Sequence, residues 1–335
     1  MSVSVAMSTH NAERYLEPLL ESLARQTRLP DELVAHDDGS EDSTVPLLES
    51  FGRSAPFPVR IDRDPVRRGF VFGFLRAAEL CEGDLIAFCD ADDVWVESKL
   101  EVCERALQGS AAWLAMHTVK VVDRELRQIA PDWPAIESTR LVPPLRLTGL
   151  HLDAPGLAIV FRRALLAIAD VDRRPESRFG AGRQMIHDEF VMFMAGVLGP
   201  VQLMAEPLVL YRQHGNNDSG WFERERRMTL TPVLDDYGNA ARHTAECARF
   251  LESTRSDDPS IAARLAAGAE HYRRAALNWE LRTSLYRAGD RRTRARLVSR
   301  MVASRAYGSR TAGGFGRLAL GKDLVGAIAL RQRAV

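Results

Sequence analysis

The chain has 335 residues, 46% of them hydrophobic, so it can bury a large core as one α/β domain with an appendage or as two smaller domains. Its 45 basic residues balance its 45 acidic ones, which excludes the global positive field of a nucleic-acid-binding protein. The balance hides an asymmetry, because residues 282–335 hold thirteen Lys or Arg against two acids.

The cysteines show no Cys-x-x-Cys spacing, which favours reduced thiols over a metal or redox motif. They are Cys81, Cys89, Cys103 and Cys247. The chain passes from Met1 directly into a strand pattern, and no window holds the roughly 18 apolar residues that span a bilayer. We therefore expect a cytoplasmic protein that is neither secreted nor integral to a membrane.

Short apolar runs alternate with helical patterns over the first ninety residues. The runs, which predict strands, lie at residues 3–7, 32–36, 59–61 and 85–89. Apolar residues at helical spacing predict helices around residues 15–23, 45–51 and 72–81. Strands joined by such helices predict βαβ crossovers and a mostly parallel sheet. The expected fold class is therefore α/β, with polar residues gathered where the strands end.

The later part of the chain changes character. Residues 113–122 predict another strand, and prolines then interrupt an irregular stretch from about 131 to 150 that we interpret as a substrate-facing insertion. Regular patterns return at residues 157–168, 187–198, 201–204 and 208–211. Beyond Trp221 the pattern is helical, with breaks expected at residues 256–259 and 313–314. We expect two regions, an α/β region over 1–220 and a helical, basic region over 221–335.

The fourth apolar run ends in an acidic cluster, Asp90, Asp92 and Asp93, which Trp95 follows. Ligand sites in parallel sheets lie beyond the carboxyl ends of the strands. Neighbouring carboxylates repel one another unless a positive charge lies among them, and a divalent cation shared with substrate phosphates is the usual partner. The cluster therefore predicts a site for a metal-bound phosphate ester. An acidic turn that caps a helix near Glu97 explains the cluster alone equally well.

Further acids follow a predicted strand or open a predicted helix. Asp38, in an Asp-Asp-Gly-Ser run, has a carboxylate suited to a base N–H or a ribose hydroxyl, and Glu13 could reach a ribose. Asp188 and Glu189 open a helix from which a carboxylate could act as general base. Each of these acids could equally compensate a helix end. His214 follows a strand, and a lone histidine is more often packed or solvated than a metal ligand.

Taken in order, these segments resemble the inverting family 2 glycosyltransferases of the GT-A fold, in which a Rossmann-like, mostly parallel sheet is flanked by helices. The resemblance covers about residues 2–220. The matching segments are Val3–Asn11, Tyr15-Leu16, Ser22-Leu23, Gln26-Thr27, Asp37–Ser43, Gly69–Val71, Phe88–Trp95, Lys99-Leu100, His187-Asp188 and Glu206–Asn217. The resemblance implies a GT-A domain over residues 1–220, followed by a C-terminal helical extension.

The resemblance also implies roles for matching residues. Asp38 would accept from the pyrimidine base, Asp90 would contact the ribose, and Asp188 would be the catalytic base. Asp92 and His214 would hold Mg²⁺ or Mn²⁺ against the donor diphosphate. The remaining donor-binding residues would be Ser8, Thr9, His10, Glu13, Arg68 and Ala91, and candidate contacts for the sugar or acceptor are Trp95, Asp93 and Glu189. A core position for Trp95 is an equally good interpretation.

The activity implied by the resemblance is one displacement. The acceptor hydroxyl loses its proton to Asp188 and attacks the anomeric carbon, whose configuration inverts. The acidic cluster and the Tyr-Arg-Gln-His-Gly-Asn-Asn run are similar to those of bacterial enzymes in surface polysaccharide or specialised glycoside assembly. This similarity favours a UDP- or dTDP-sugar donor, with dTDP-rhamnose as a candidate. The acceptor would be a glycan, a lipid-linked molecule or a small molecule.

The basic C-terminal segment offers a further partner. It interleaves Arg287, Arg291, Arg294, Arg300 and Arg305 with Leu297, Val298, Met301 and Val302. This pattern predicts a basic amphipathic helix that lies on an anionic cytoplasmic leaflet, which would make the protein peripheral to the membrane. A helical cap with a solvated Arg face explains the same pattern equally well.

Other functions fit the sequence less well. A sugar nucleotidyltransferase or a dinucleotide dehydrogenase needs a glycine-rich loop after the first strand, and residues 8–11 contain no glycine. A catalytically silent relative that acts as a scaffold at the membrane surface stays open, although the complete set of acids and His214 favours an enzyme. The sequence leaves the donor sugar, the acceptor, the choice of metal ion and the oligomeric state undecided.

Overall fold

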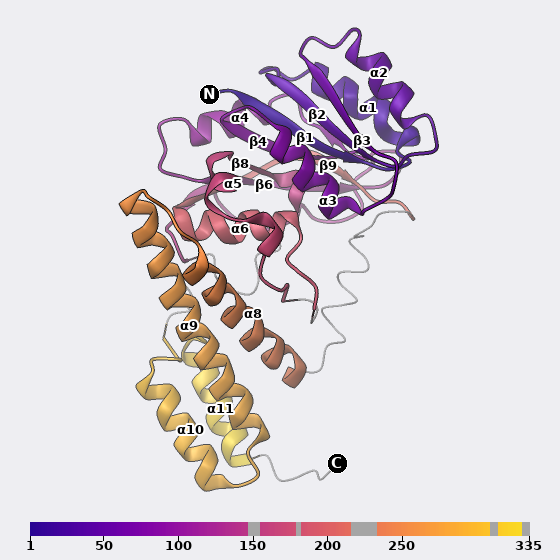
Figure 1. The fold of residues 1–335 in the computed structure, drawn as a ribbon. Coiled ribbons are helices and arrows are strands. Elements are labelled where there is room, and N and C mark those ends of the chain that lie inside the picture. The colour runs from indigo at the N-terminus through magenta and orange to yellow at the C-terminus, as the bar shows by residue number, and fades with distance from the viewer. Residues whose placement is uncertain (147–154, 179–181, 216–232, 309–313, 330–335) are drawn as a thin grey trace.

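The computed structural model describes residues 1–146, 155–178, 182–215, 233–308 and 314–329, and the side chains of 233–236 and 326–329 are not described. Figure 1 shows a twisted sheet flanked by helices at one end of the molecule and a group of long helices at the other. The expected border at residue 220 lies outside the described residues. Part of the expected insertion, residues 147–150, and Gly313 of the second expected break also lie outside them.

Four parallel strands form the first half of the sheet in the order β3-β2-β1-β4. They are β1 (Val3–Thr9), β2 (Glu32–Asp38), β3 (Val59–Asp64) and β4 (Leu85–Asp90). The helices between them are α1 (Glu13–Ala24), α2 (Thr44–Gly52) and α3 (Phe70–Leu80). The strands β1, β2 and β4 are buried almost throughout, as parallel strands covered on both faces should be. The predicted alternation of strands and helices is confirmed.

The second half of the sheet mixes strand directions, which the sequence patterns did not predict. β8 (Ile159–Arg162) runs antiparallel to β4 and to β6 (Leu114–Val122), and β6 pairs in parallel with β9 (Val201–Arg212). The short strands β5 (Val94–Trp95) and β7 (Arg140–Val142) pair antiparallel with β9. The two apolar runs after residue 200 form one strand, and its register shifts near Pro207, which has no N–H for the ladder.

Three shorter helices complete the sheet region, namely α4 (Lys99–Leu107), α5 (Ala164–Ile168) and α6 (His187–Leu198). α6 has the predicted bounds and is buried on nearly all sides, which is typical of a helix enclosed by its neighbours. Its Phe190 packs on Phe250 of α8 (Val233–Ser253), and its Phe193 packs on Tyr272 of α9 (Pro259–Arg287). α6 therefore joins the sheet to the long helices.

Two of the C-terminal helices begin directly after an aspartate that caps them. The carboxylate of Asp258 accepts from the backbone N–H of Ser260 at 2.8 Å, and Pro259 occupies the first turn of α9. The break predicted at residues 256–259 is confirmed, since α8 ends at Ser253. Asp290 caps α10 (Arg291–Ala303) in the same way, and α11 (Arg317–Ala329) follows. Within the described residues, no helix has both the length and the apolar character that crossing a bilayer requires.

A second, smaller core holds α9, α10 and α11 together. Arg282 of α9 pairs with the buried carboxylate of Asp323 of α11 at 3.1 Å, and Tyr286 and Tyr307 donate to the same carboxylate. The apolar side chains around this group are Leu281, Leu285, Val298, Met301, Ala306, Tyr307, Phe315 and Ala319. Val298 and Met301 are two of the four apolar residues in the predicted amphipathic pattern of α10. Packing within the protein covers these two, whereas Val302 is 52% exposed.

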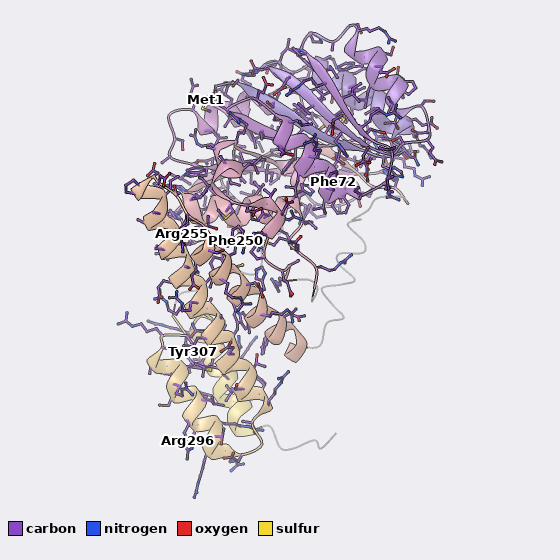
Figure 2. All side chains as sticks on the ribbon, in the orientation of Figure 1. Met1, Phe72, Phe250, Arg255, Arg296 and Tyr307 are labelled. Atoms are coloured by element: carbon purple, nitrogen blue, oxygen red, sulfur yellow. The ribbon has the colours of Figure 1, made fainter. Side chains whose placement is uncertain are left out.

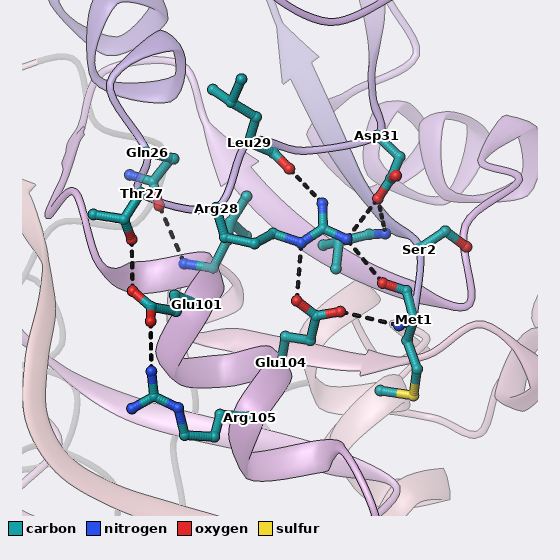
Figure 3. A network of polar contacts seen from close by, with 12 residues as sticks. Met1, Ser2, Gln26, Thr27, Arg28, Leu29, Asp31, Glu101, Glu104 and Arg105 are labelled. Carbon is teal, nitrogen blue, oxygen red and sulfur yellow. Dashed lines mark hydrogen bonds and ion pairs between the residues drawn. The ribbon is translucent and has the colours of Figure 1, made fainter.

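The amino end of β1 is anchored by a group of charged contacts around Arg28 (Figure 3). Nε of Arg28 donates to Glu104 of α4 at 2.9 Å, and its guanidinium pairs with Asp31 at 2.8 Å. The terminal ammonium of Met1 donates to the other oxygen of Glu104 at 3.0 Å. These contacts lie at the end of β1 opposite to the end that carries the polar residues predicted to bind a ligand.

Candidate functional site

Three strand ends meet at one edge of the sheet. Thr9 of β1 pairs with Asp37 of β2, and Ser8 pairs with Asp90 of β4. Because β1, β2 and β4 run in the same direction, their carboxyl ends open toward the same edge. The residues predicted to bind a nucleotide after the first, second and fourth strands are therefore neighbours in the structure.

The strand β9 brings His214 to the acidic cluster. β5 pairs antiparallel with β9, and Nε2 of His214 lies 2.8 Å from Oδ2 of Asp92, 122 residues away in the chain. The His214 ring stacks on the ring of Tyr15 of α1, with their centroids 4.7 Å apart. The guanidinium of Arg212 lies 4.7 Å from the same Tyr15 centroid and donates from Nε to the carbonyl oxygen of Asp92. Tyr15 and Arg212 therefore support the Asp92 and His214 pair.

The sequence analysis had assigned no site role to either supporting residue. Arg212 is the last residue of β9 and precedes His214 by two positions, and this closeness in the chain was a usable signal. Tyr15 looked like one more residue of an apolar helix face. Only its stacking on His214 identifies it as part of the site.

The Asp92 and His214 pair fits a divalent cation bound together with a phosphate ligand. It supplies one oxygen and one nitrogen donor, a combination that Mn²⁺ accepts and that Mg²⁺ tolerates. In the described part of the chain, no group of three or more His, Cys, Asp or Glu side chains gathers in a metal-binding arrangement. A Mg²⁺-like ion usually takes one or two protein ligands and completes its shell with phosphates and water. Two protein donors are therefore enough for such an ion.

Asp188 lies in the first turn of α6, where the general base is expected. Burial, together with the charge of Glu189, raises the pKa of Asp188 to about 8. The charge of Asp90 raises the same pKa further, so the end of β4 and the start of α6 are close enough to interact. A carboxylate with a pKa near the working pH has the proton affinity that general-base catalysis needs.

Glu189 has a structural role at the start of α6. Its Oε2 accepts from the backbone N–H of Ile186 at 3.2 Å, and its Oε1 accepts from the hydroxyl of Ser177 at 3.1 Å. Both oxygens of Glu189 are therefore engaged in holding the helix end. Asp188 also contacts the helix end, since its Oδ1 accepts from the backbone N–H of Glu189 at 2.7 Å. The engagement of both Glu189 oxygens still favours Asp188 as the base.

We expect Glu189→Ala to lower the free energy of unfolding by about 1 kcal/mol, since the capping hydrogen bond is lost, and to reduce turnover by less than about tenfold. Urea unfolding and steady-state kinetics measure the two effects. Glu189→Gln keeps an acceptor oxygen and should recover most of the stability. A loss of turnover as large as that of an Asp188 variant would make Glu189 the base.

Asp38 is tied to the loop that precedes α3. Its two carboxylate oxygens accept from the backbone N–H groups of Arg68 at 2.6 Å and of Gly69 at 2.7 Å. Gly69 has a φ of 95°, a conformation that favours glycine and that turns the two N–H groups toward one carboxylate. The side chain of Arg68 pairs with Asp64 and lies over the ring of Phe72. The predicted hydrogen bond from the N–H of a nucleotide base to Asp38 must therefore use a carboxylate lone pair that these two backbone N–H groups leave available.

The residues that follow β1 are fastened to β2. The hydroxyl of Thr9 donates to the carboxylate of Asp37 at 3.2 Å, and Nδ1 of His10 lies 2.8 Å from the carbonyl oxygen of Asp38. These contacts hold the backbone at the end of β1 beside the end of β2. Their predicted role in lining the nucleoside stays a prediction.

Glu13 and Ser8 contact neighbouring helices. Glu13 accepts from the backbone N–H of Ser43 at 3.0 Å, and its own N–H donates to Asp42 at 3.2 Å, so α1 and α2 exchange contacts at their first turns. This geometry supports the helix-end interpretation of Glu13. Ser8 is packed against α3, because a Cβ on Gly73 would lie 2.1 Å from the Ser8 hydroxyl oxygen.

The remainder of the acidic segment turns into the core. Asp93 is fully buried, and its Oδ1 accepts from the backbone N–H of Arg212 at 2.9 Å. Burial and the other two acids of the cluster raise the pKa of Asp93 well above its usual range. Trp95 is only 2% exposed, and Ala91 packs against the main core. The structure therefore does not present Asp93 or Trp95 to a sugar, because the pairing of β5 with β9 draws both inward.

Comparisons with known proteins agree with this architecture. Residues 4–168 match the model of the family described as glycosyl transferase family 2. An uncharacterized glycosyltransferase of Nostoc sp. is 27% identical over 224 residues, which cover 65% of this chain and 66% of that protein. The dTDP-rhamnosyl transferase RfbG of Shigella flexneri is 28% identical over 228 residues, which cover 64% of this chain and 73% of that protein.

Solved structures extend the likeness to the fold of nearly the whole chain. Residues 1–349 of TarS from S. aureus, crystallised with UDP-GlcNAc, match with a TM-score of 0.54 and 17% identity, over 98% of this chain and 88% of that one. At this identity the likeness concerns the fold, and it agrees with the expected GT-A arrangement. With the family match over β1–β4 and the acidic cluster, it follows that the chain carries a glycosyltransferase family 2 domain with the GT-A fold.

Proposed function

We propose that this enzyme transfers a sugar from a nucleoside-diphosphate donor to an acceptor hydroxyl with inversion at the anomeric carbon. The observation that carries the proposal is the placement of Asp188 at the start of α6, where the neighbouring His187 ring packs on Phe88 of β4 with centroids 4.9 Å apart, beside the strand end that leads to the Asp92 and His214 pair. A base and a diphosphate site at one edge are what a single displacement requires. We further propose that residues 1–220 form the donor and catalytic region.

In this proposal each group of the chain has one task. Asp188 accepts the proton of the acceptor hydroxyl as the oxygen attacks, a step that typically contributes about 10²- to 10⁴-fold. Asp38 and Asp90, at the ends of β2 and β4, orient the base and the ribose. Asp92 and His214 would hold Mg²⁺ or Mn²⁺, which would offset charge on the leaving diphosphate.

The donor is proposed to be a UDP- or dTDP-sugar. RfbG is named as a dTDP-rhamnosyl transferase, and WfgD of Escherichia coli, 31% identical over 100 residues, as a glucosyltransferase that uses UDP-Glc. The match to WfgD covers 30% of this chain and 38% of that protein. Both names support a pyrimidine nucleoside diphosphate, and RfbG supports dTDP-rhamnose as the first sugar to try.

Thermal stabilisation of the purified protein by UDP, dTDP, GDP and CMP, each with Mn²⁺, with Mg²⁺ or without a divalent ion, tests the donor site. We expect a metal-dependent rise in Tm with UDP or dTDP, because a ligand that binds only the folded state stabilises it. Release of UDP or dTDP from matching sugar nucleotides then identifies the sugar. No response to any of the four nucleotides would overturn the proposed function.

For the acceptor, we propose a lipid-linked molecule at an anionic cytoplasmic membrane surface. WfgD is named for an acceptor linked to diphosphoundecaprenol. Figure 2 places Arg296 at the helical end of the molecule, far from Phe72 beside the sheet. Leu318 and Val325 of α11 are 79% and 64% exposed and lie on one helix face, seven residues apart. Residues 291–322 contain basic but no acidic residues, which suits an anionic lipid surface.

Flotation with vesicles tests the membrane proposal. We expect the protein to float with vesicles that contain phosphatidylglycerol and to stay behind with pure phosphatidylcholine. A variant that carries Leu318→Ser and Val325→Ser should lose flotation and keep nucleotide-dependent stabilisation. Equal behaviour of this variant and the unmodified protein, or no flotation of either, would favour a glycan or small-molecule acceptor in solution.

A further inference from the structure

Lys99, the first residue of α4, is a buried cation that the proposed function leaves unused. Its side chain is 0% exposed. Only three of the 45 basic residues of the chain are lysines, and the other two, Lys120 and Lys322, are exposed. A chain that uses arginine for nearly every positive charge therefore keeps an ammonium at one fully buried position. Removing such a group from water is costly, so a specific set of partners must hold it there.

The ammonium of Lys99 lies between two segments of the site. Nζ donates to the carbonyl oxygen of Leu157 at 2.8 Å and lies 3.3 Å from the centroid of the Trp95 ring. The backbone of Trp95 is held firmly, because it pairs with Val209 of β9 and its backbone N–H donates to the hydroxyl of Ser22 at 3.1 Å. Lys99 thus rests on a fixed aromatic ring and reaches from it to the short turn at residues 156–158.

That turn packs directly against the catalytic base. A Cβ added to Gly156 would lie 2.6 Å from Nε2 of His187 and 3.6 Å from Cβ of Asp188. His187 cannot easily move away, because its ring stacks on Phe74 with centroids 4.1 Å apart. The backbone N–H of Gly156 also interacts with the Asp188 carboxylate and favours its charged form. The position of the turn therefore influences the position of Asp188.

The charges around Lys99 suit a buried ammonium. The carboxyl groups of Asp93 and Asp90 favour the charged form of Lys99, although burial, the largest effect, lowers the pKa of Lys99 to about 8. Lys99 in turn lies close enough to the thiol of Cys89 for its charge to act on it. The cation therefore interacts electrostatically with the acidic cluster.

We propose that Lys99 is a positioning residue that holds the 156–158 turn, and through this turn Asp188, from the fixed ring of Trp95. The inference rests on the proposed role of Asp188 as general base. This role of Lys99 differs from a purely structural one. If Lys99 served only stability, its replacement by an apolar residue would cause no loss of turnover.

The test compares Lys99→Met with the matched control Lys120→Met. Methionine has a similar length and no charge, and replacing a buried charge by an apolar group is often neutral or stabilising. We expect Lys99→Met to keep or raise Tm and to lower kcat by about 10- to 100-fold, as a displaced catalytic group does. The KM for the donor should change by less than about threefold. Lys120→Met should leave all three values unchanged.

Hydrogen exchange of the peptide that covers residues 155–162 gives a readout that needs no substrate. We expect faster exchange in Lys99→Met at this peptide alone, since the Leu157 carbonyl loses its donor. Unchanged exchange together with unchanged kcat would overturn the inference. So would a variant that fails to fold, or one whose Tm and kcat fall in parallel, because Lys99 would then support the core itself.

A double-variant cycle with Gly156→Ala tests whether both residues act through the turn. The new methyl group would press on His187, so we expect a fall in kcat for Gly156→Ala as well. If the two residues share one path, the double variant loses less than the product of the single losses, whereas independent effects multiply. If the unmodified protein binds and turns over no nucleotide sugar, the proposed function fails, and the exchange experiment still decides whether Lys99 holds the turn.

Discussion

Asp188→Asn is expected to slow sugar transfer by about 10²- to 10⁴-fold and to leave donor binding nearly unchanged. Asparagine has almost the same shape but cannot accept the acceptor proton. In the proposed function Asp188 acts on the acceptor, and Asp92 and His214 hold the donor diphosphate, so the affinity for the nucleoside diphosphate should not depend on the charge of Asp188. Steady-state kinetics measure the first effect, and nucleotide-dependent thermal stabilisation measures the second.

Asp257→Asn is the matched control for this experiment, since Asp257 is an exposed acid in the connection between α8 and α9. It should leave both turnover and stability unchanged. Full turnover by Asp188→Asn would exclude Asp188 as the base. Loss of nucleotide binding together with turnover would instead place Asp188 in the donor site.

The pH dependence of the reaction and of stability should change in opposite directions. The base works in its deprotonated form, and the pKa of Asp188 is raised to about 8, so turnover should rise with pH up to about 8 and then level off. A carboxyl group whose pKa is raised on folding binds its proton more tightly in the folded state. Its contribution to stability is therefore lost as pH rises from about 4 to about 8. Asp188→Asn cannot ionise, so it should be more stable than the unmodified protein at pH 9.

Asp92→Asn is expected to remove the metal dependence of donor binding and to lower turnover by about 10²- to 10³-fold. Stabilisation of the leaving group by a metal ion amounts to several kcal/mol, and about 1.4 kcal/mol corresponds to a tenfold change in rate. The neutral amide also weakens the contact with Nε2 of His214, now 2.8 Å from the carboxylate. Titration of the protein with UDP or dTDP, with and without Mn²⁺, measures the effect.

His214→Ala separates the contribution of His214 to metal-dependent nucleotide binding from that of Asp92. If both side chains ligate the ion, His214→Ala should also weaken metal-dependent binding, whereas Asp257→Asn should not. Nucleotide binding by Asp92→Asn that still responds fully to Mn²⁺ would show that the ion, if it takes part, is held elsewhere.

Local pattern was sufficient for the first half of the sheet and for several helices. Strands β1–β4 alternate with helices, and α6 begins at His187 and ends at Leu198 as predicted. These elements follow from period and capping, which depend on neighbouring residues only. The placement of polar groups at strand ends was also predictable, because parallel strands joined by crossovers end at the same edge. Hence the neighbourhood of Asp38 and Asp90 was foreseen.

The antiparallel strands were not predictable in the same way. β8, β5 and β7 pair with distant segments, and no local period reports the direction of such pairing. Because β5 pairs with β9, Trp95 and Asp93 turn inward. The sequence had left both residues as candidate contacts for the sugar. The apolar face of α10 was visible in the sequence, but its partner inside the protein was not.

The sequence by itself determined the fold class, the strand-end positions of the acids predicted to bind a nucleotide and the candidate base, because these depend on local period and on motif order. Only the tertiary structure decided that Asp92 and His214 meet across 122 residues and that both oxygens of Glu189 hold the start of α6. Only the tertiary structure shows that Lys99 is buried against the 156–158 turn, which contacts the proposed base Asp188. These features arise from long-range pairing and from competition among side chains for hydrogen-bond partners, and neither leaves a pattern in the order of residues.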